Sequence, residues 1–512
     1  MNDFPWLTAL ILVPLVGAVV TAFLPTGVDK MVGLGVSLLT LVGVVVMATG
    51  YDTSGGMQFT EQHEWITVFG AYYAVGVDGL GLVMVALTAL LVPIVLIASW
   101  HEAGEETGRD PGSFFAWTLA LEAFSIAVFA ATDVFLFYVL FEATLIPAYF
   151  LIGGWGRSGR GRAAVKFLIY QLGGGLVMLG SVIGLYVVSA DAGHPTYLMS
   201  ELGDLDISQS AQQWLFVGFF IAFAAKAPLF PLHTWLADTT EKATPPTSVL
   251  LVCILDKIGA YGMLRICLGI LPGASEWATP VVVVLALISI VYGALVALGQ
   301  DDILRLVGLT SLSHFGLIVL GIFVFTPEGG SGAILYMVNH GIATALLFLV
   351  VGYLVKRSGT TLISEMGGYE KSAPVLAGVL LIAGLAACGL PGLSPFVSEL
   401  LVLIAAFDHA PWVGAVAVTV IVLAAFYALW MYQRTVTGPE RPDRGRLPDL
   451  DRREVGTVAP LVLALVLFGF FPMPLLDAIN PAVDSILQQV DYQDDGPDVP
   501  AAEPEMVEEG QQ

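Results

Sequence analysis

The sequence FAAKAPLFPLHTW at residues 223–235 places a lysine and two prolines in the middle of a long apolar segment. Proline has no backbone N–H, so it removes the hydrogen bond to the carbonyl four residues earlier in a helix. Pro228 and Pro231 are therefore expected to free the carbonyls of Ala224 and Ala227. The segment predicts a membrane helix that is broken near its middle, beside an ionisable side chain.

A second stretch, LAACGLPGLSPFVSELL at residues 385–401, repeats this pattern later in the chain. Here Pro391 and Pro395 precede Glu399, and the carbonyls of Ala387 and Pro391 are expected to be free. Unwound backbone is tolerated inside a membrane only where it is buried in protein or lines a cavity. Two such breaks in corresponding places indicate transport sites rather than ordinary proline kinks.

The rest of the chain has the composition of a membrane protein. It has 512 residues, of which 57% are hydrophobic and 12% are charged, whereas soluble proteins carry roughly 25% charged residues. Apolar runs of about twenty residues are long enough to cross a bilayer as helices. The first run has no basic residue before it and is expected to be a retained span. The runs predict fourteen spans, at 5–24, 31–49, 78–99, 113–131, 133–153, 164–189, 212–237, 246–271, 278–299, 303–325, 331–354, 373–408, 411–434 and 456–475.

Basic residues lie almost entirely in alternate loops. Of the twenty Lys and Arg residues, seventeen fall in the loops that would face the cytoplasm if the N-terminus were outside, and none falls in the opposite loops. This distribution predicts a multi-pass membrane protein with both termini on the outer side. The net charge of −23 lies partly in the acidic, Pro-containing segment 481–512, which is expected to be disordered.

Several ionisable residues lie inside the predicted spans, where a charge costs at least about 2.5–3.5 kcal/mol. Such residues are candidates for function if they face a protein or water interior. They are Glu122, Glu142, Lys226, His233, Asp256, Lys257, Arg265, His314, His340 and Glu399.

The spacing of these residues predicts an internal repeat. Lys226 and Glu399 are 173 residues apart, and Glu142 and His314 are 172 apart. A repeat of five helices, an odd number, inserts its second copy upside down. The predicted fold is therefore an all-α integral membrane protein with two inverted five-helix repeats, each containing a broken helix. The expected units are 1–112 (spans 1–3), 113–271 (first repeat), 278–434 (second repeat), 435–480 (loop and span 14) and 481–512 (tail).

These residue types suit the movement of protons. A buried lysine loses affinity for its proton through desolvation and regains it beside a carboxylate, so Glu142 and Lys226 could act as a switchable pair. Lys257 is the next expected acceptor, and His314 and His340 can pass protons in either direction. Glu399 would end the line.

Each candidate also has a structural interpretation. A buried Glu142–Lys226 pair can simply fix helix packing, and either histidine can simply hydrogen-bond to a neighbouring helix. His233 lies beyond the break, and Arg265 can extend toward the outer membrane surface. The sequence suggests no partner for Glu122 or Asp256. The cysteines (Cys253, Cys267 and Cys388) lie in apolar segments without metal-site spacing, which favours small buried hydrophobic residues.

Five motifs now carry a resemblance over nearly the whole chain. They are FLFYVLFEATLIPAYFLIGGWG (135–156), KAPLFPLHTWLADTTEKATPPTSVLLVCILDKIGAYGMLR (226–265), TSLSHFG (310–316), MVNHG (337–341) and PGLSPFVSELLVL (391–403). In this order they resemble the subunit M family of bacterial NADH–quinone oxidoreductase, which is called chain 4 in mitochondrial and chloroplast-type relatives.

The resemblance implies a proton-translocating membrane subunit that carries no redox centre or metal itself. The other membrane subunits, related antiporter-like subunits among them, would be its partners in the lipid bilayer, and nucleic acid would not. FMN, iron–sulfur clusters and quinone would lie on partner subunits. The family's functional glutamate, two lysines and second acidic residue fall at Glu142, Lys226, Lys257 and Glu399. Ala237 stands where the family usually has proline, and Asp256 matches no general feature of the family.

Two other functions are compatible with these motifs. A subunit of a multi-subunit sodium/proton antiporter shares the fold, although those relatives commonly have lysine where this chain has Glu399. A scaffold subunit that transports nothing would make the interior charges dispensable, which the two broken helices argue against.

Overall fold

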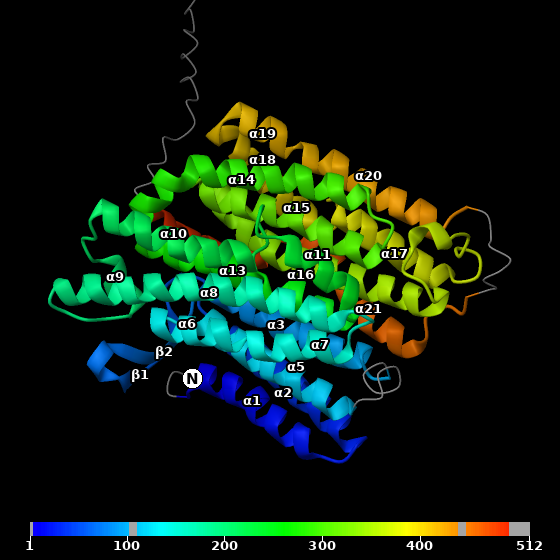
Figure 1. Ribbon diagram of the computed structural model, residues 1–512, viewed down its shortest axis with the longest axis horizontal. Coiled ribbons are helices and arrows are strands. Elements are labelled where there is room, and N and C mark those ends of the chain that lie inside the picture. The colour runs from blue at the N-terminus through cyan, green and yellow to red at the C-terminus, as the bar shows by residue number, and fades with distance from the viewer. Residues whose placement is uncertain (1–3, 102–109, 439–446, 491–512) are drawn as a thin grey trace, which may run out of the picture.

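The chain forms one bundle of long helices that lie nearly parallel to one another. The computed structural model describes residues 4–101, 110–438 and 447–490. Figure 1 shows the helices side by side, from α1 and α2 at one edge to α19 and α20 at the other. A helix hydrogen-bonds its own backbone polar groups, which a segment inside a lipid bilayer must do because no water is available there. The predicted all-α membrane fold is confirmed.

Eleven of the fourteen predicted spans are helices long and apolar enough to cross a membrane without a major break, among the described residues. Two of the eleven, the fifth and the thirteenth span, each consist of two abutting helices. The eleven are α1 (Trp6–Phe23), α2 (Val28–Thr49), α3 (Gly79–Ala98), α5 (Pro111–Ala130), α6 with α7 (Val134–Ala143 and Leu145–Trp155), α8 (Arg160–Asp191), α14 (Pro272–Leu298), α15 (Ile303–Phe323), α16 (Pro327–Ser358), α19 with α20 (Pro411–Ala417 and Thr419–Thr435) and α21 (Arg452–Phe470).

The other three predicted spans are interrupted helices. The seventh consists of α10 (Gln209–Lys226) and α11 (Thr234–Lys242), and the twelfth of α17 (Pro374–Ala387) and α18 (Pro395–His409). Both predicted breaks therefore lie at the proline pairs. The eighth is α12 (Pro245–Val249), α13 (Lys257–Gly262) and two π-helical segments, η2 (Leu250–Leu255) and η3 (Met263–Leu268). Nothing in the sequence indicated this third irregularity.

Two helices form the centre of the bundle. The apolar stretches of α15 and α16 are entirely buried inside the protein, although each helix is long and apolar enough to cross a membrane. In contrast, α2 and α21 are mostly exposed, and large apolar side chains such as Leu39, Val42 and Leu463 point outward. The two central helices therefore lie in a protein interior, where polar side chains can pair with each other instead of with lipid.

Acidic and hydroxyl side chains fix where several helices begin. Asp133 accepts a hydrogen bond from the Leu136 N–H at 2.8 Å, and Asp302 accepts from the N–H groups of Leu304 and Arg305 at 3.0 Å. These are N-caps, which satisfy N–H groups that have no partner within the helix. They hold α6 and α15, two helices that carry candidate residues, at defined starting points.

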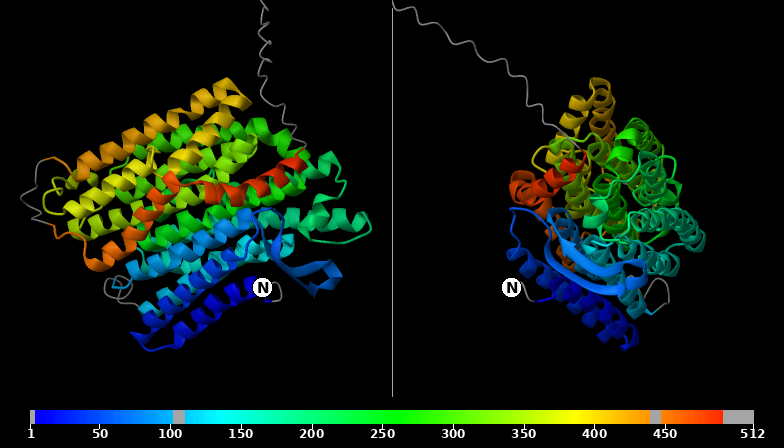
Figure 2. Two further views of the ribbon diagram at one scale, coloured as in Figure 1. Left: turned by 180° about the vertical axis from the view of Figure 1, so that it is seen from behind. Right: turned by 90° about the vertical axis from the view of Figure 1, so that its left-hand side faces the viewer.

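One end of the bundle carries a β-hairpin and a short helix that the sequence did not predict. Strands β1 (Gln58–Ile66) and β2 (Ala71–Val77) pair antiparallel, and α9 (Met199–Gly203) lies at the same end. Figure 2 shows the hairpin projecting from the bundle.

The predicted disorder from residue 481 onward is wrong for its first nine residues. Helix α22 runs from Met473 to Gln489, and Ile479, Val483 and Ile486 are buried on one face. This spacing of apolar residues places them on the same side of a helix, which packs against α3, α16 and η3. Residues 491–512 lie outside the described part of the chain.

A buried ion pair joins α16 to α21 at the opposite end of the bundle. The Arg357 guanidinium donates two hydrogen bonds to the Glu454 carboxylate, one of them at 3.0 Å, and the two side chains are 9% and 3% exposed. Glu454 also completes a capping box with Asp451. We expect Glu454→Gln to destabilise the protein by about 3 kcal/mol, because it leaves a buried guanidinium without its counter-charge.

The measurement for this prediction is the thermal unfolding temperature of the detergent-solubilised protein. Glu276→Gln is the matched control, because it neutralises an exposed carboxylate on α14. Equal unfolding temperatures for the two variants would contradict a stabilising role for the pair.

Candidate functional site

Lys226 is the last residue of α10 and is completely buried at the first break. Its Nζ donates hydrogen bonds to the Phe141 carbonyl at 3.1 Å and to the Thr144 hydroxyl at 2.9 Å. Nζ also lies 3.7 Å from the centre of the Phe141 ring, which is a cation–π contact. The ammonium group is thus held by the junction of α6 and α7.

Glu142 belongs to the same junction but makes no ion pair with Lys226 within 4.0 Å. Its carboxylate lies against Gly175 on α8, where a Cβ atom would be only 1.8 Å from Oε1. Oε1 is buried and has no hydrogen-bond partner among the described residues. The Glu142 carboxylate and the Lys226 ammonium group are therefore neighbours that do not pair directly in this structure. That they switch between a paired and an unpaired state stays a prediction.

Side chains satisfy the backbone at the first break. The Ala225 carbonyl accepts hydrogen bonds from Gln171 Nε2 at 3.2 Å and from Trp235 Nε1 at 2.9 Å. The expectation that Ala224 has a free carbonyl is wrong, because this carbonyl accepts from the Leu229 N–H at 3.1 Å. Pro228 cannot donate to this carbonyl, but the chain bends enough at the prolines for the N–H of Leu229, five residues after Ala224, to donate in its place.

Lys257 is also completely buried and lies between the two π-helical segments. Its Nζ is 2.6 Å from His340 Nδ1, 3.2 Å from the Val252 carbonyl and 4.4 Å from the centre of the Phe315 ring. Short π segments occur often at functional sites because they change the direction of side chains. Lys257 thus points from the eighth span toward α16 in the second half of the chain.

Two histidines continue from Lys257 through the centre of the bundle. The rings of His340 on α16 and His314 on α15 meet edge to face, with centroids 5.1 Å apart. His314 Nε2 then lies 2.8 Å from the Tyr427 hydroxyl on α20. All three side chains are at most 3% exposed. The structure therefore brings both predicted histidines into one line with Lys257.

Glu399 lies at the second break, at the end of this line. Its Oε1 accepts a hydrogen bond at 2.7 Å from Tyr336, whose ring is 5.9 Å from His314 and 6.0 Å from His340 between centroids. The carboxylate packs against Gly389, where a Cβ would be 2.0 Å from Oε2. Glu142 and Glu399 therefore both occupy space that a glycine leaves free.

Two secondary candidates lie apart from this line. The His233 ring packs against Phe230 and Tyr292, and its Nδ1 has no partner among the described residues. Glu122 on α5 is 1% exposed, and neither of its carboxyl oxygens has a partner in the described part of the chain. Among the described residues, no hydrogen bond or ion pair joins either side chain to Lys226 or Lys257.

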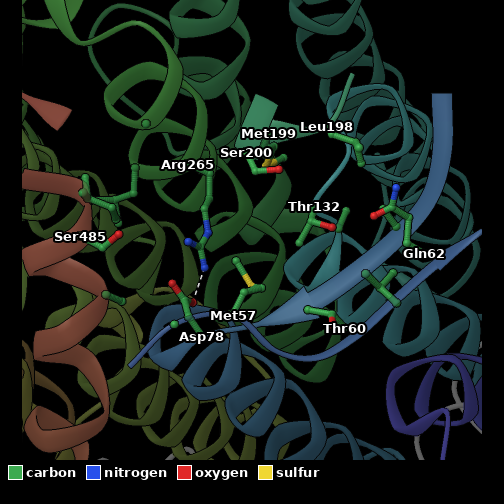
Figure 3. Close-up of a pocket in the computed structure, with 18 of the residues that line it drawn as sticks. Met57, Thr60, Gln62, Asp78, Thr132, Leu198, Met199, Ser200, Arg265 and Ser485 are labelled. Carbon is green, nitrogen blue, oxygen red and sulfur yellow. Dashed lines mark hydrogen bonds and ion pairs between the residues drawn. The ribbon is translucent and has the colours of Figure 1, made fainter. Parts of the chain in front are cut away.

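Arg265 has an acidic partner in the structure. It forms a buried ion pair with Asp78, the N-cap of α3, and its Nε donates to the Tyr261 hydroxyl at 3.2 Å. Figure 3 shows the pair in a cavity of about 400 Å³ between the hairpin, α9 and α22, with Thr132 and Ser485 on its walls. Asp78 lies 187 residues earlier in the chain, so this partner could not be recognised from the sequence around Arg265.

A network of ion pairs links the two halves at the opposite end. Asp238 on α11 accepts from Lys166 and from Arg305, each at 2.6 Å, and Glu241 accepts from Arg305 at 2.9 Å. Burial alone would raise the pKa of the Asp238 carboxyl, but hydrogen bonds from Lys166 and Arg305 outweigh burial and lower the pKa. This carboxylate therefore stays charged at neutral pH and holds α11 to α8 and α15.

The site can bind and pass protons, and it offers no metal site within residues 4–101, 110–438 and 447–490. Sequence reasoning missed Thr144, Tyr336, Tyr427 and the two glycines. Thr144 could have been predicted as a candidate, because it lies two residues after Glu142 in the same motif. The others were not accessible, because their roles depend on contacts between helices that are far apart in sequence.

Comparison with known proteins agrees with this architecture. The family described as NADH:quinone oxidoreductase/Mrp antiporter, transmembrane, matches residues 131–424. The chain therefore belongs to this family of antiporter-like membrane subunits. A Mycobacterium tuberculosis protein named NADH-quinone oxidoreductase subunit M is 45% identical over 98% of this chain and 97% of its own length.

Solved structures give the same result. A chain of respiratory complex I from Thermus thermophilus with bound NADH has 33% identity and a TM-score of 0.87, over 94% of this chain and 99% of that chain. A chain of the Mrp complex from Dietzia sp. has 22% identity and a TM-score of 0.83, over 95% of this chain and 99% of that one. The second likeness shows the fold alone. The relative of 45% identity thus links the chain to subunit M within this family.

The glycine beside Glu142 gives a direct test of the site. Gly175→Ala should displace the Glu142 carboxylate and reduce function strongly without changing any charge, because the new Cβ would lie 1.8 Å from Oε1. Gly173→Ala on the same helix is the matched control, since nothing lies within 4 Å of its Cβ. The measurement is proton pumping in membrane vesicles with assembly checked, and equal activity of the two variants would contradict the assigned position of Glu142.

Proposed function

We propose that this chain is the proton-translocating subunit M of an NADH–quinone oxidoreductase. Its own side chains move protons across the membrane, and the energy comes from quinone reduction elsewhere in the complex. The relatives that carry this name match the chain over nearly its full length. The chain is then one subunit of a translocating enzyme and holds no redox centre itself.

The observation that carries the proposal is the row of buried polar groups that runs from Lys257 to Glu399. Lys257, His340 and His314 are in contact or adjacent, and the hydroxyls of Tyr427 and Tyr336 extend the line toward the second break. Proton transfer needs titratable groups within hydrogen-bond reach of one another or of a bridging water. A purely structural core would not place these groups in sequence across α13, α16, α15 and α18.

The partners follow from the proposed reaction. Electrons would travel from NADH through FMN and iron–sulfur clusters to quinone on other subunits, and related antiporter-like subunits would flank this chain in the bilayer. The solved relatives lie within multi-subunit membrane complexes, which supports such an assembly.

We further propose the orientation and the inverted repeats. Seventeen basic residues in alternate loops favour cytoplasmic placement of those loops, so the hairpin, α22 and both termini would lie outside. The units 113–271 and 278–434 each contain a break with an ionisable residue beside it. The 173-residue spacing of Lys226 and Glu399, one beside each break, supports a common origin of the two units.

The rival functions predict different results. A sodium/proton antiporter subunit would purify with antiporter subunits only, whereas the proposed subunit would purify with flavin- and iron–sulfur-containing chains. A scaffold subunit would tolerate the loss of its interior charges. The low identity of 22% to the Mrp chain and the acidic residue Glu399 favour the oxidoreductase.

The proposed mechanism requires Glu142 and Lys226 to act as a unit. Glu142→Gln should weaken proton binding at Lys226 and slow pumping strongly, and Lys226→Ala should do similar damage. The double variant should be little worse than either single variant, which is the signature of coupled residues. Glu142→Asp should retain part of the activity, because it keeps the charge and loses only reach.

NADH-driven proton pumping in vesicles is the measurement, with the amount of assembled complex determined for each variant. If the losses from the two single variants simply add, the residues act independently. The Glu142–Lys226 switch would then be abandoned.

A further inference from the structure

The hydrogen bonds and ion pairs of the described residues leave Lys226 and Lys257 unconnected. Lys226 is held by the α6–α7 junction, while Lys257 points to His340. No hydrogen bond or ion pair joins the two lysines in the described part of the chain. A proton that reaches Lys226 therefore needs another group to bring it to the second half of the molecule.

Asp256 faces this gap. It directly precedes Lys257, and adjacent residues of a helix point about 100° apart. Asp256 instead shares a face with Gly259, three residues later. Gly259 packs directly on the first break, because a Cβ there would lie 2.5 Å from the Ala227 nitrogen and 2.6 Å from the Phe223 carbonyl oxygen. The face that carries Asp256 is therefore the face that contacts the end of α10.

The Asp256 carboxyl has no other bonding role in the structure. The residue is 0% exposed, and neither Oδ1 nor Oδ2 has a hydrogen-bond partner among the described residues. It lies close enough to Lys226 and to Lys257 to act on both electrostatically. A buried carboxyl without partners is costly and is rarely kept for packing alone.

We propose that Asp256 carries the proton from Lys226 to Lys257 and so connects the two halves of the path. This inference rests on the proposed function of the chain. The Lys226 ammonium gives a proton to the Asp256 carboxylate, which leaves a neutral amine and a neutral carboxylic acid. The acid then gives that proton to the neutral Lys257 amine, and the carboxylate is restored. One N–H and one O–H bond break while one O–H and one N–H bond form, and no electrons are exchanged.

The first experiment measures NADH-driven pumping by the intact complex with Asp256→Asn. Asparagine has the same shape and suits the same packing, but it cannot accept and release the proton. We expect assembled complex with a severe loss of both pumping and coupled quinone reduction. Asp256→Glu should recover part of the activity, because it restores the carboxyl group. Cys253→Ala, a buried substitution one turn earlier on the same helix, is the control for local packing and should pump normally.

A second measurement separates proton transfer from positioning. Infrared difference spectra of the complex during turnover should contain a carboxylic acid C=O band that shifts in D₂O and is absent from Asp256→Asn. A residue that only positions Lys257 would give no such band. Normal pumping by assembled Asp256→Asn, or spectra identical to those of the parent protein, would overturn the inference.

The two levels of the proposal fail differently. If Lys226→Ala and Lys257→Ala abolish pumping while Asp256→Asn does not, only the connecting role of Asp256 is lost. If all three variants pump normally, the proposed function of the chain is lost with it.

Discussion

The charge of Lys226, buried in the middle of a membrane bundle, is the constraint on which the rest of the structure depends. A charge at that depth costs at least about 2.5–3.5 kcal/mol unless the protein replaces its water shell. The replacement here is a carbonyl, a hydroxyl and an aromatic face, all from the α6–α7 junction. Without this junction, the broken helix would present an unsolvated ammonium group to an apolar interior.

The break itself follows from the same constraint. The prolines end α10 directly after Lys226, and Gln171 and Trp235 satisfy the exposed carbonyl of Ala225. Lys226 is thus held by neutral groups, and the Glu142 carboxylate lies nearby, packed against Gly175. If this carboxylate moves toward the ammonium group, we expect the proton affinity of the lysine to rise, because a nearby opposite charge favours the charged form. In contrast, the Arg265–Asp78 and Arg357–Glu454 pairs bind charge to charge directly, as fixed structural contacts do.

The sequence predicted the class, the fourteen spans and the two breaks, because apolar length and proline chemistry are local properties. It also selected Lys257, His314, His340 and Glu399, because ionisable residues are rare within spans. It could not predict the π segments around Lys257 or the partners Tyr336, Tyr427 and Asp78, because these depend on how distant helices pack. Residues 481–489, the last turns of α22, were wrongly predicted to be disordered. The acidic composition of the residues beyond them outweighed their short amphipathic pattern. The functional roles of the site residues stay predictions.

Replacing Lys257 tests whether protons cross the bundle through this lysine, as we propose. The complex with Lys257→Ala, reconstituted in vesicles, is supplied with NADH, and the pH gradient formed per NADH oxidised is recorded. We expect an assembled complex that reduces an artificial electron acceptor normally but forms little or no gradient, because the void left in the line has no titratable group. An assembled variant that pumps with the parental yield would mean that protons do not cross through Lys257.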